Sequence, residues 1–197
     1  MNIAFFASYN GSSAHAITDA CFNGDLIASP VFLLSNNKKS NALKWAEDKG
    51  LKTACLNGIT HPDPDDLDKA IADKLELYQI NIICLSGYMK LLGPHTMKAV
   101  NGKVINVHPA LLPKYDGKGM YGDHVHQAVK DNEDTETGST IHLVNEKYDE
   151  GRILAQNHIA LSPQDSVSDI AEKVKDAEPT FYVDTLRKII KGDILLD

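Results

Sequence analysis

The sequence is poor in cysteine and has no closely spaced cysteine pair. Cys21, Cys55 and Cys84 are the three cysteines among 197 residues. A redox or structural metal site would normally show a Cys-x-x-Cys spacing, which does not occur here. We therefore expect three reduced, buried thiols rather than disulfides or metal ligands.

The chain also lacks a basic leader, a long apolar run and an excess of positive charge. Its first six residues do not resemble a targeting segment, so we expect none, and no stretch approaches the roughly 18 apolar residues of a membrane span. The net charge of -7 disfavours binding to nucleic acid through a broad basic surface. We expect a cytoplasmic protein, a monomer or homodimer, that binds neither membranes nor nucleic acids.

Apolar runs of strand length alternate with segments of helical periodicity along the chain. This alternation predicts an α/β fold: a single Rossmann-like, doubly wound domain over 1–197, with a mostly parallel sheet, helices on both faces and an antiparallel strand near the C-terminal edge. The strands at 80–85 and 103–107 should be central, because they are rich in branched residues. The predicted strands are 2–8, 27–35, 52–56, 80–85, 103–107, 138–146 and 152–161, and the predicted helices are 12–23, 41–49, 64–78, 122–131 and 166–190.

Ligands of such sheets bind at the carboxyl ends of the strands, so the loops that follow the strands are the candidate sites. The first loop contains Asn10, Gly11, Ser12 and Ser13 before a helix. Its backbone N–H groups and the helix dipole favour a phosphate. Alternatively, Ser12 or Asn10 caps the helix and Gly11 makes the turn.

A second candidate loop, 85–92, follows a central strand and is mostly apolar. Gly87 would allow a ligand to approach the backbone closely. Such a loop either packs on the core or offers an apolar surface to a flat heterocycle.

The segment 106–113 carries the residues best suited to catalysis. Asn106 and His108 are two residues apart on a strand, so both side chains should point to the same side. An amide and an imidazole together can bind an oxyanion and exchange a proton. Asp149, in the turn 148–151, could hold His108 in its cationic form or relay a proton, although an Asp-Glu-Gly turn is ordinarily only a hairpin turn.

The sequence Asn106-Val107-His108-Pro109, the following Leu111-Leu112-Pro113-Lys114-Tyr115, and Asp149 in a Tyr-Asp-x-Gly turn resemble the folate-dependent formyltransferases that act on glycinamide ribonucleotide. The resemblance covers almost the whole chain. It implies transfer of a formyl group from the co-substrate 10-formyltetrahydrofolate to the amino group of 5'-phosphoribosylglycinamide (GAR), a step of purine biosynthesis, without a metal.

The resemblance also implies a role for each matching residue. Asn106, His108 and Asp149 would form the catalytic trio. The phosphate and ribose of GAR would be bound by Asn10, Gly11, Ser12, Ser13, Gly87, Pro109 and Glu178. The folate would be bound by Leu85, Met89, Lys90, Leu91, Leu92, Met97, Val104, His142, Tyr148 and Asp149.

Several positions depart from the family pattern. Tyr9 and Ser13 stand where the family usually has glycine and asparagine, and Lys90 replaces a frequent arginine. In the last helix, Pro179 and Val183 replace a usual histidine and a frequent proline. Phosphate binding by backbone groups would survive these changes.

The loop 116–122 is longer than the common family form and resembles one glycine-rich branch. The family's contacts at this loop are therefore not carried over to this chain.

Other functions remain open at this point. Formyltetrahydrofolate hydrolase is the main alternative. Related enzymes formylate methionyl-tRNA or sugar nucleotides. A chain of 197 residues is expected to lack the extra domains of the hydrolase and of the tRNA enzyme. A second alternative is a protein that binds folate or a nucleotide and has no enzymatic activity. A metal enzyme would need ligands from His108, His124, His126, His142 or His158, which have no recognised ligand spacing.

Overall fold

The computed structural model describes residues 1–117, 119–120 and 122–196. The chain divides into two compact units. The first unit comprises Met1–Ile105 together with Leu196, and the second comprises Asn106–Leu195. In the described residues, no helix combines the length and apolar character needed to cross a membrane.

The first unit is a parallel sheet connected by helices. The chain forms β1 (Asn2–Phe6), α1 (Ser12–Phe22), β2 (Ser29–Ser35), α2 (Asn41–Asp48), β3 (Lys52–Cys55), α3 (Pro64–Leu77), β4 (Ile82–Leu85), α4 (Pro94–Ala99) and the start of β5 (Val104–His108). β1 pairs with β2 and β4, β2 with β3, and β4 with β5, all in parallel. The strand order therefore reverses between β1 and β4.

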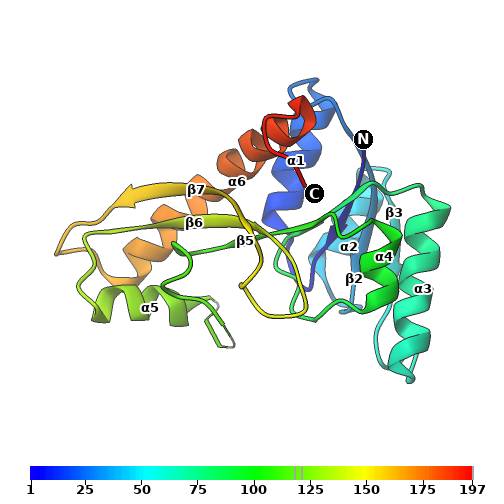
Figure 1. Ribbon diagram of the computed structural model, residues 1–197, viewed down its shortest axis with the longest axis horizontal. Coiled ribbons are helices and arrows are strands. Elements are labelled where there is room, and N and C mark those ends of the chain that lie inside the picture. The colour runs from blue at the N-terminus through cyan, green and yellow to red at the C-terminus, as the bar shows by residue number, and fades with distance from the viewer. Residues whose placement is uncertain (118, 121, 197) are drawn as a thin grey trace. The chain divides into compact units, whose positions relative to one another are not determined.

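This reversal decides where the helices of the first unit lie. Crossovers between parallel strands are right-handed, so a reversal of direction moves the later helices to the opposite face of the sheet. α3 and α4 lie side by side, as Figure 1 shows. Ile3 to Phe6 of β1 and Ile82 to Cys84 of β4 are buried, because helices cover both faces of these strands.

The second unit is built on an antiparallel pair of strands. It contains the end of β5, α5 (Asp123–Asp131), β6 (Glu136–Leu143), β7 (Ile153–Ala160) and α6 (Val167–Lys191). β6 and β7 form a long hairpin with α6 alongside it and α5 against α6 (Figure 1). A small core of Ala110, Tyr115, Val125, Val129 and Ile170 lies among these elements.

The strands form one sheet in the order β3-β2-β1-β4-β5-β6-β7. The predicted α/β class, the central position of β4 and β5 and the antiparallel strands at the C-terminal edge are confirmed. Observed and predicted boundaries differ by a few residues at most. The capping box predicted for the last helix is also confirmed, since Ser166 and Asp169 exchange side-chain-to-backbone hydrogen bonds at the start of α6.

One helix was not predicted from the sequence. α4 has six residues and begins at Pro94 after Gly93. Its first N–H groups are bound by the carboxylate of Asp68 in α3, which accepts from the N–H of His95 at 2.7 Å and from that of Thr96 at 2.9 Å. The cap therefore comes from a distant part of the chain rather than from a residue just before the helix.

Gly138 is a position in β6 where the β6–β7 hairpin has no room for a side chain. A Cβ atom there would lie 1.9 Å from the backbone oxygen of Asn157. Gly138→Ala is expected to lower the free energy of unfolding by about 1–3 kcal/mol, because the added methyl group would collide with a backbone atom, which cannot move aside as a flexible side chain can. Urea denaturation measures the change. Gly58→Ala is the control, since a Cβ at Gly58 meets nothing within 4 Å, and equal stability losses in both variants would contradict the prediction.

Candidate active site

In the first unit, two loops predicted to bind ligands are joined at the point where the strand order reverses. The N–H of Ser8, after β1, donates to the carbonyl of Gly87, after β4, at 3.1 Å. The N–H of Met89 donates back to Oγ of Ser8 at 2.9 Å. Oγ of Ser86 accepts from the N–H of Ala14, in the first turn of α1, at 3.2 Å. The reversal point of an open α/β sheet is its usual ligand site, so these hydrogen bonds shape that site.

The helix α1 begins differently from either sequence interpretation of its cap. Gly11 is the N-cap residue, in the left-handed conformation with φ of 65°, and it makes no side-chain cap hydrogen bond, whereas Oγ of Ser86 accepts from the N–H of Ala14 in the first turn. The predicted capping by Ser12 or Asn10 is therefore wrong: Oδ1 of Asn10 instead accepts from Nδ2 of Asn41 at 2.9 Å. Ser12 is exposed and Ser13 is buried. A left-handed glycine turns the chain so that the start of the helix follows the loop directly.

The loop after β4 exposes apolar side chains. Met89 is 43% exposed and Leu91 55% exposed, and Lys90 beside them is exposed as well. An exposed apolar pair next to a ligand site suits a flat heterocycle. The other residues predicted to bind folate in this unit are more buried: Leu85 and Val104 lie in the core, and Leu92 and Met97 are half-buried.

In the second unit, the predicted catalytic residues lie together. Nδ1 of His108 is 3.6 Å from Oδ2 of Asp149, and Nε2 of His142 is 3.5 Å from Oδ1 of the same carboxylate. Nδ2 of Asn106 is 3.2 Å from Nε2 of His142. Asn106 and His108 therefore share one side of β5, as predicted, and His142 of β6 completes a four-residue cluster.

The hydrogen bonds of His108 determine which nitrogen carries its proton. Nε2 of His108 lies 2.7 Å from the backbone oxygen of Tyr115. A carbonyl oxygen only accepts, so Nε2 must carry a hydrogen. In the neutral ring Nδ1 then has a lone pair, and it faces the carboxylate of Asp149. His108 can gain or lose a proton only at Nδ1.

The same reasoning orients the amide of Asn106. Nδ1 of His142 lies 2.9 Å from the backbone oxygen of Leu143, so Nδ1 is the donor and Nε2 accepts. The group facing Nε2 is therefore the amide nitrogen of Asn106. One N–H of that amide is bound to His142, and the amide carries a second N–H donor.

Burial, rather than charge, dominates the protonation of His108. Burial lowers the pKa of His108 below its ordinary value of 6.5, and this outweighs the opposite effect of Asp149 and of the hydrogen bond to Tyr115. Of the two roles considered for Asp149, holding His108 in its cationic form does not apply to the free protein, although Asp149 does raise the pKa of His108 as expected. Near neutral pH, His108 is a neutral base.

Asp149 sits in a constrained turn between β6 and β7. Its φ is 58°, a left-handed conformation that aspartate tolerates better than most residues. Gly151 follows, and a Cβ there would lie 1.6 Å from the backbone oxygen of Leu143. The close approach of these two backbone segments holds the turn in place, so that the 13% exposed carboxylate of Asp149 faces both imidazoles.

The remaining predicted site residues are half-buried or exposed. Pro109 is half-buried directly after His108, Tyr148 is 45% exposed beside Asp149, and Glu178 is half-buried in α6. Tyr115 and its partners were not predicted as functional. Tyr115 contacts His108 through its backbone carbonyl, a group that any residue could supply, so the residue type gives no indication of the contact.

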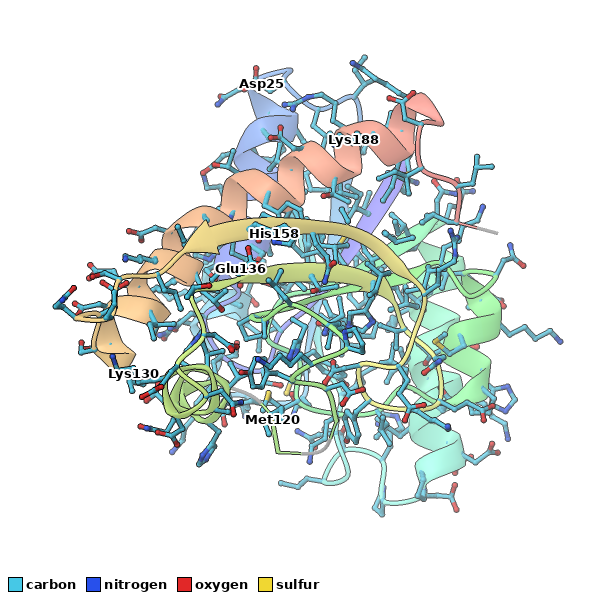
Figure 2. All side chains as sticks on the ribbon, turned by 60° about the vertical axis from the view of Figure 1, so that its left-hand side comes forward. Asp25, Met120, Lys130, Glu136, His158 and Lys188 are labelled. Carbon is cyan, nitrogen blue, oxygen red and sulfur yellow. The ribbon has the colours of Figure 1, made fainter. Side chains whose placement is uncertain are left out.

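A metal centre built on the predicted histidines does not fit the register of β6 and β7. His142 pairs with Ile153, whereas His158 lies opposite Gly138, near the other end of the hairpin. Nδ1 of His158 lies 3.1 Å from Oε2 of Glu136, and Figure 2 shows these two side chains together on neighbouring strands. Within the described residues, no group of three or more His, Cys, Asp or Glu is arranged to hold a metal ion. The three cysteines are free, Cys84 is buried and Cys21 and Cys55 are half-buried.

Three histidines with lowered pKa make stability depend on pH. Burial holds the pKa of His15, His108 and His126 below 6.5. The unfolded chain therefore binds more protons just below pH 6.5 than the folded protein does. The contribution of these neutral histidines to the free energy of unfolding should be complete above that pH. It should be lost as the pH decreases through the pKa values of the folded protein, by up to ~1.4 kcal/mol per pH unit for each group.

Urea denaturation between pH 7.5 and pH 5 measures this dependence. His126→Gln should reduce the slope, since it removes one of the three groups. Stability that stays constant over this range, or a slope unchanged in the variant, would contradict the assignment.

A mostly parallel α/β sheet that carries an amide, two imidazoles and a carboxylate in one cluster defines a Rossmann-like protein with the groups needed for acyl-type transfer. The family model described as formyl transferase matches residues 1–186. The chain belongs to the formyl transferase family.

Several proteins named phosphoribosylglycinamide formyltransferase are similar to this chain in sequence or structure. The chain is 34% identical over 193 residues to the chloroplastic phosphoribosylglycinamide formyltransferase of Arabidopsis thaliana, covering 98% of this chain and 66% of that protein. It is 31% identical to the phosphoribosylglycinamide formyltransferase of Haemophilus influenzae, covering 98% of this chain and 89% of the relative. The crystal structure of phosphoribosylglycinamide formyltransferase from Brucella melitensis matches with a TM-score of 0.87 and 31% identity, over 98% of this chain and 97% of that one.

Proposed function

We propose that this protein transfers the formyl group of 10-formyltetrahydrofolate to the amino group of GAR, giving formylglycinamide ribonucleotide and tetrahydrofolate in purine biosynthesis. Membership of the formyl transferase family and the names of the relatives support this activity. The observation that carries the mechanism is the cluster of Asn106, His108, His142 and Asp149, in which a neutral base, a carboxylate and an amide donor lie together.

The reaction is a direct transfer without a covalent enzyme intermediate. The neutral amine of GAR attacks the formyl carbon, a C–N bond forms, and the carbonyl oxygen takes up the electron pair. The nitrogen gives its proton to Nδ1 of His108, either directly or through the carboxylate of Asp149. The resulting imidazolium N–H and the second amide N–H of Asn106 then stabilise the oxyanion.

Collapse of this intermediate reverses the proton movement. The bond between the formyl carbon and the folate nitrogen breaks, and that nitrogen receives the proton held by His108 and Asp149. His108 returns to its neutral form with Nε2–H still bound to Tyr115. A lowered pKa suits this cycle, because it provides the base form at neutral pH and a ready donor once the proton is taken up.

The substrate assignments follow the two units separately. In the first unit, we assign the phosphate of GAR to the loop of Asn10, Gly11, Ser12 and Ser13, with Gly87 beside it, because this loop leads into the N-terminus of α1, where the N-cap residue is Gly11. Pro109 and Glu178 of the second unit are assigned to GAR on the family resemblance alone. Folate is assigned to the loop 85–92, Met97 and Val104 in the first unit, and to His142, Tyr148 and Asp149 in the second.

Purified protein with 10-formyltetrahydrofolate, assayed by the absorbance change of folate deformylation with and without GAR, tests the proposal. Formyl transfer predicts turnover only when GAR is present, with formylglycinamide ribonucleotide as product. Turnover without an acceptor and release of free formate would instead establish a formyltetrahydrofolate hydrolase. Folate binding without turnover in either arm would indicate a binding protein that has kept the fold.

A further inference from the structure

The backbone oxygen that contacts Nε2 of His108 belongs to Tyr115, whose side chain is itself fixed by packing and hydrogen bonds. Tyr115 presents its carbonyl to Nε2 of His108 at 2.7 Å, and its ring packs in the core of the second unit with Val125, Val129 and Ile170. Tyr115 is seven residues beyond His108, so the contact is made by a loop and not by regular secondary structure. The loop has to be fixed by other groups if the carbonyl is to stay at the imidazole.

The phenol of Tyr115 is anchored by the turn that follows α5. Its hydroxyl donates to Oδ2 of Asp134 at 2.5 Å and accepts from Nδ2 of Asn132 at 2.9 Å. The other oxygen of Asp134 accepts from Nζ of Lys114 at 2.5 Å. Asp134 is held as a carboxylate: burial raises its pKa, but the hydrogen bonds from Lys114 and Tyr115 together bring the pKa below its usual value. A charged acceptor makes the bond from the Tyr115 hydroxyl a strong one.

The segment between His108 and Tyr115 is fixed independently by side chains of β6 and β7. Oγ1 of Thr140 donates to the carbonyl of Ala110 at 2.7 Å and accepts from the N–H of Leu112 at 3.0 Å. Nε2 of Gln156 donates to the carbonyl of Leu112 at 2.9 Å. The loop therefore begins from a fixed segment, and Tyr115 with Asp134 fixes its far end.

We propose that Tyr115 and Asp134 are positioning residues for His108: the anchored phenol holds the Tyr115 carbonyl at Nε2, which keeps the proton there and leaves Nδ1 facing Asp149. This inference rests on the proposed function for its kinetic consequence, but not for its structural one. The partner of one imidazole nitrogen selects the tautomer of the ring and its direction. Without the anchor, the ring would populate the other tautomer, whose Nδ1 already carries a proton and cannot accept one from the amine.

The test compares Tyr115→Phe and Asp134→Asn with Asp131→Asn. Tyr115→Phe removes the hydroxyl and keeps the ring in the core. Asp131 ends α5 and pairs with Gln127, so its variant changes a nearby exposed carboxylate without contacting Tyr115. Long-range ¹H–¹⁵N correlation spectra of the histidine side chains report the tautomer of His108, and steady-state kinetics report kcat and KM.

The expected result is an Nε2–H tautomer in the wild type and in Asp131→Asn, and a mixture of tautomers in Tyr115→Phe and Asp134→Asn. In the latter two variants kcat should fall on the order of 10-fold with KM for GAR unchanged, as is typical of groups that orient a reacting residue. The double variant should lose little more than either single variant, because both act on one anchor.

The proposal is overturned if both variants keep the wild-type tautomer and kcat while only their melting temperature falls, since the anchor would then be purely structural. It is also overturned if the tautomer changes and kcat does not. Failure of the proposed function looks different: the wild type would show no GAR-dependent turnover, and the spectra, which need no substrate, would still decide whether Tyr115 and Asp134 set the tautomer.

Discussion

Replacement of His108 by alanine is expected to lower kcat for formyl transfer by ~10²–10⁴-fold, the range for loss of a general base. In the proposed mechanism, His108 receives the proton at Nδ1 and then donates to the oxyanion. Both roles arise during the reaction, so KM for either substrate should change little. Single-turnover and steady-state assays with GAR and 10-formyltetrahydrofolate measure the effect.

His158→Ala is the matched control for this loss. It removes an exposed histidine that contacts Glu136 on the β6–β7 hairpin and does not touch the cluster. Its kcat should stay close to the wild-type value. Circular dichroism and thermal melting should show that both variants are folded. A decrease of less than tenfold in a folded His108→Ala protein would remove His108 from the chemical step.

Asp149→Asn is expected to lower kcat by ~10²-fold and to lower the pKa of His108 further. Asparagine adopts the left-handed conformation of this position as readily as aspartate, so the turn should be kept while the charge is lost. Asp149 is the main group that raises the pKa of His108 against the effect of burial. Its removal favours the neutral ring and weakens proton uptake from the attacking amine.

An NMR titration of His108 and the pH dependence of kcat measure the two effects. Glu150→Gln is the control, because Glu150 is the neighbouring carboxylate and pairs with Lys147 on the surface at 2.9 Å. This variant should leave both the pKa of His108 and kcat unchanged. A pKa of His108 that stays the same or rises in Asp149→Asn would contradict the electrostatic role of Asp149.

The parts of the fold that depend on local pattern could be predicted from the sequence. The alternation of strands and helices, the buried character of β4 and β5, and the Ser166 cap follow from neighbouring residues. α4 could not be predicted in the same way, because Asp68 supplies its cap from 26 residues before Pro94. The helix α1 begins at residue 12 as predicted, but the capping by Asn10 was wrong for a related reason: Asn10 bonds to Asn41 instead of capping its own helix.

The candidate site shows the same division. The two-residue spacing of Asn106 and His108 predicted a shared direction, and the structure places both side chains in one cluster. The protonation of His108 could not be predicted, because it depends on burial against residues distant in sequence. The role we propose for Tyr115 depends on a main-chain oxygen and on Asp134, so residue type carried no signal for it.

The anchoring of Tyr115 bears on how the following loop can vary in length among related proteins. The support of His108 ends at Tyr115, and the next fixed element, α5, begins at Asp123. Insertions or deletions between these two points change the length of chain beyond the hydrogen bonds of Tyr115, and connecting segments generally accept changes in length at small cost. Changes in length between branches of the family can therefore leave the hydrogen bond from His108 to Tyr115 in place. Substitution of Asp116, whose charge raises the pKa of His108, or of Met120, which packs against the core around Tyr115, would still act on the imidazole.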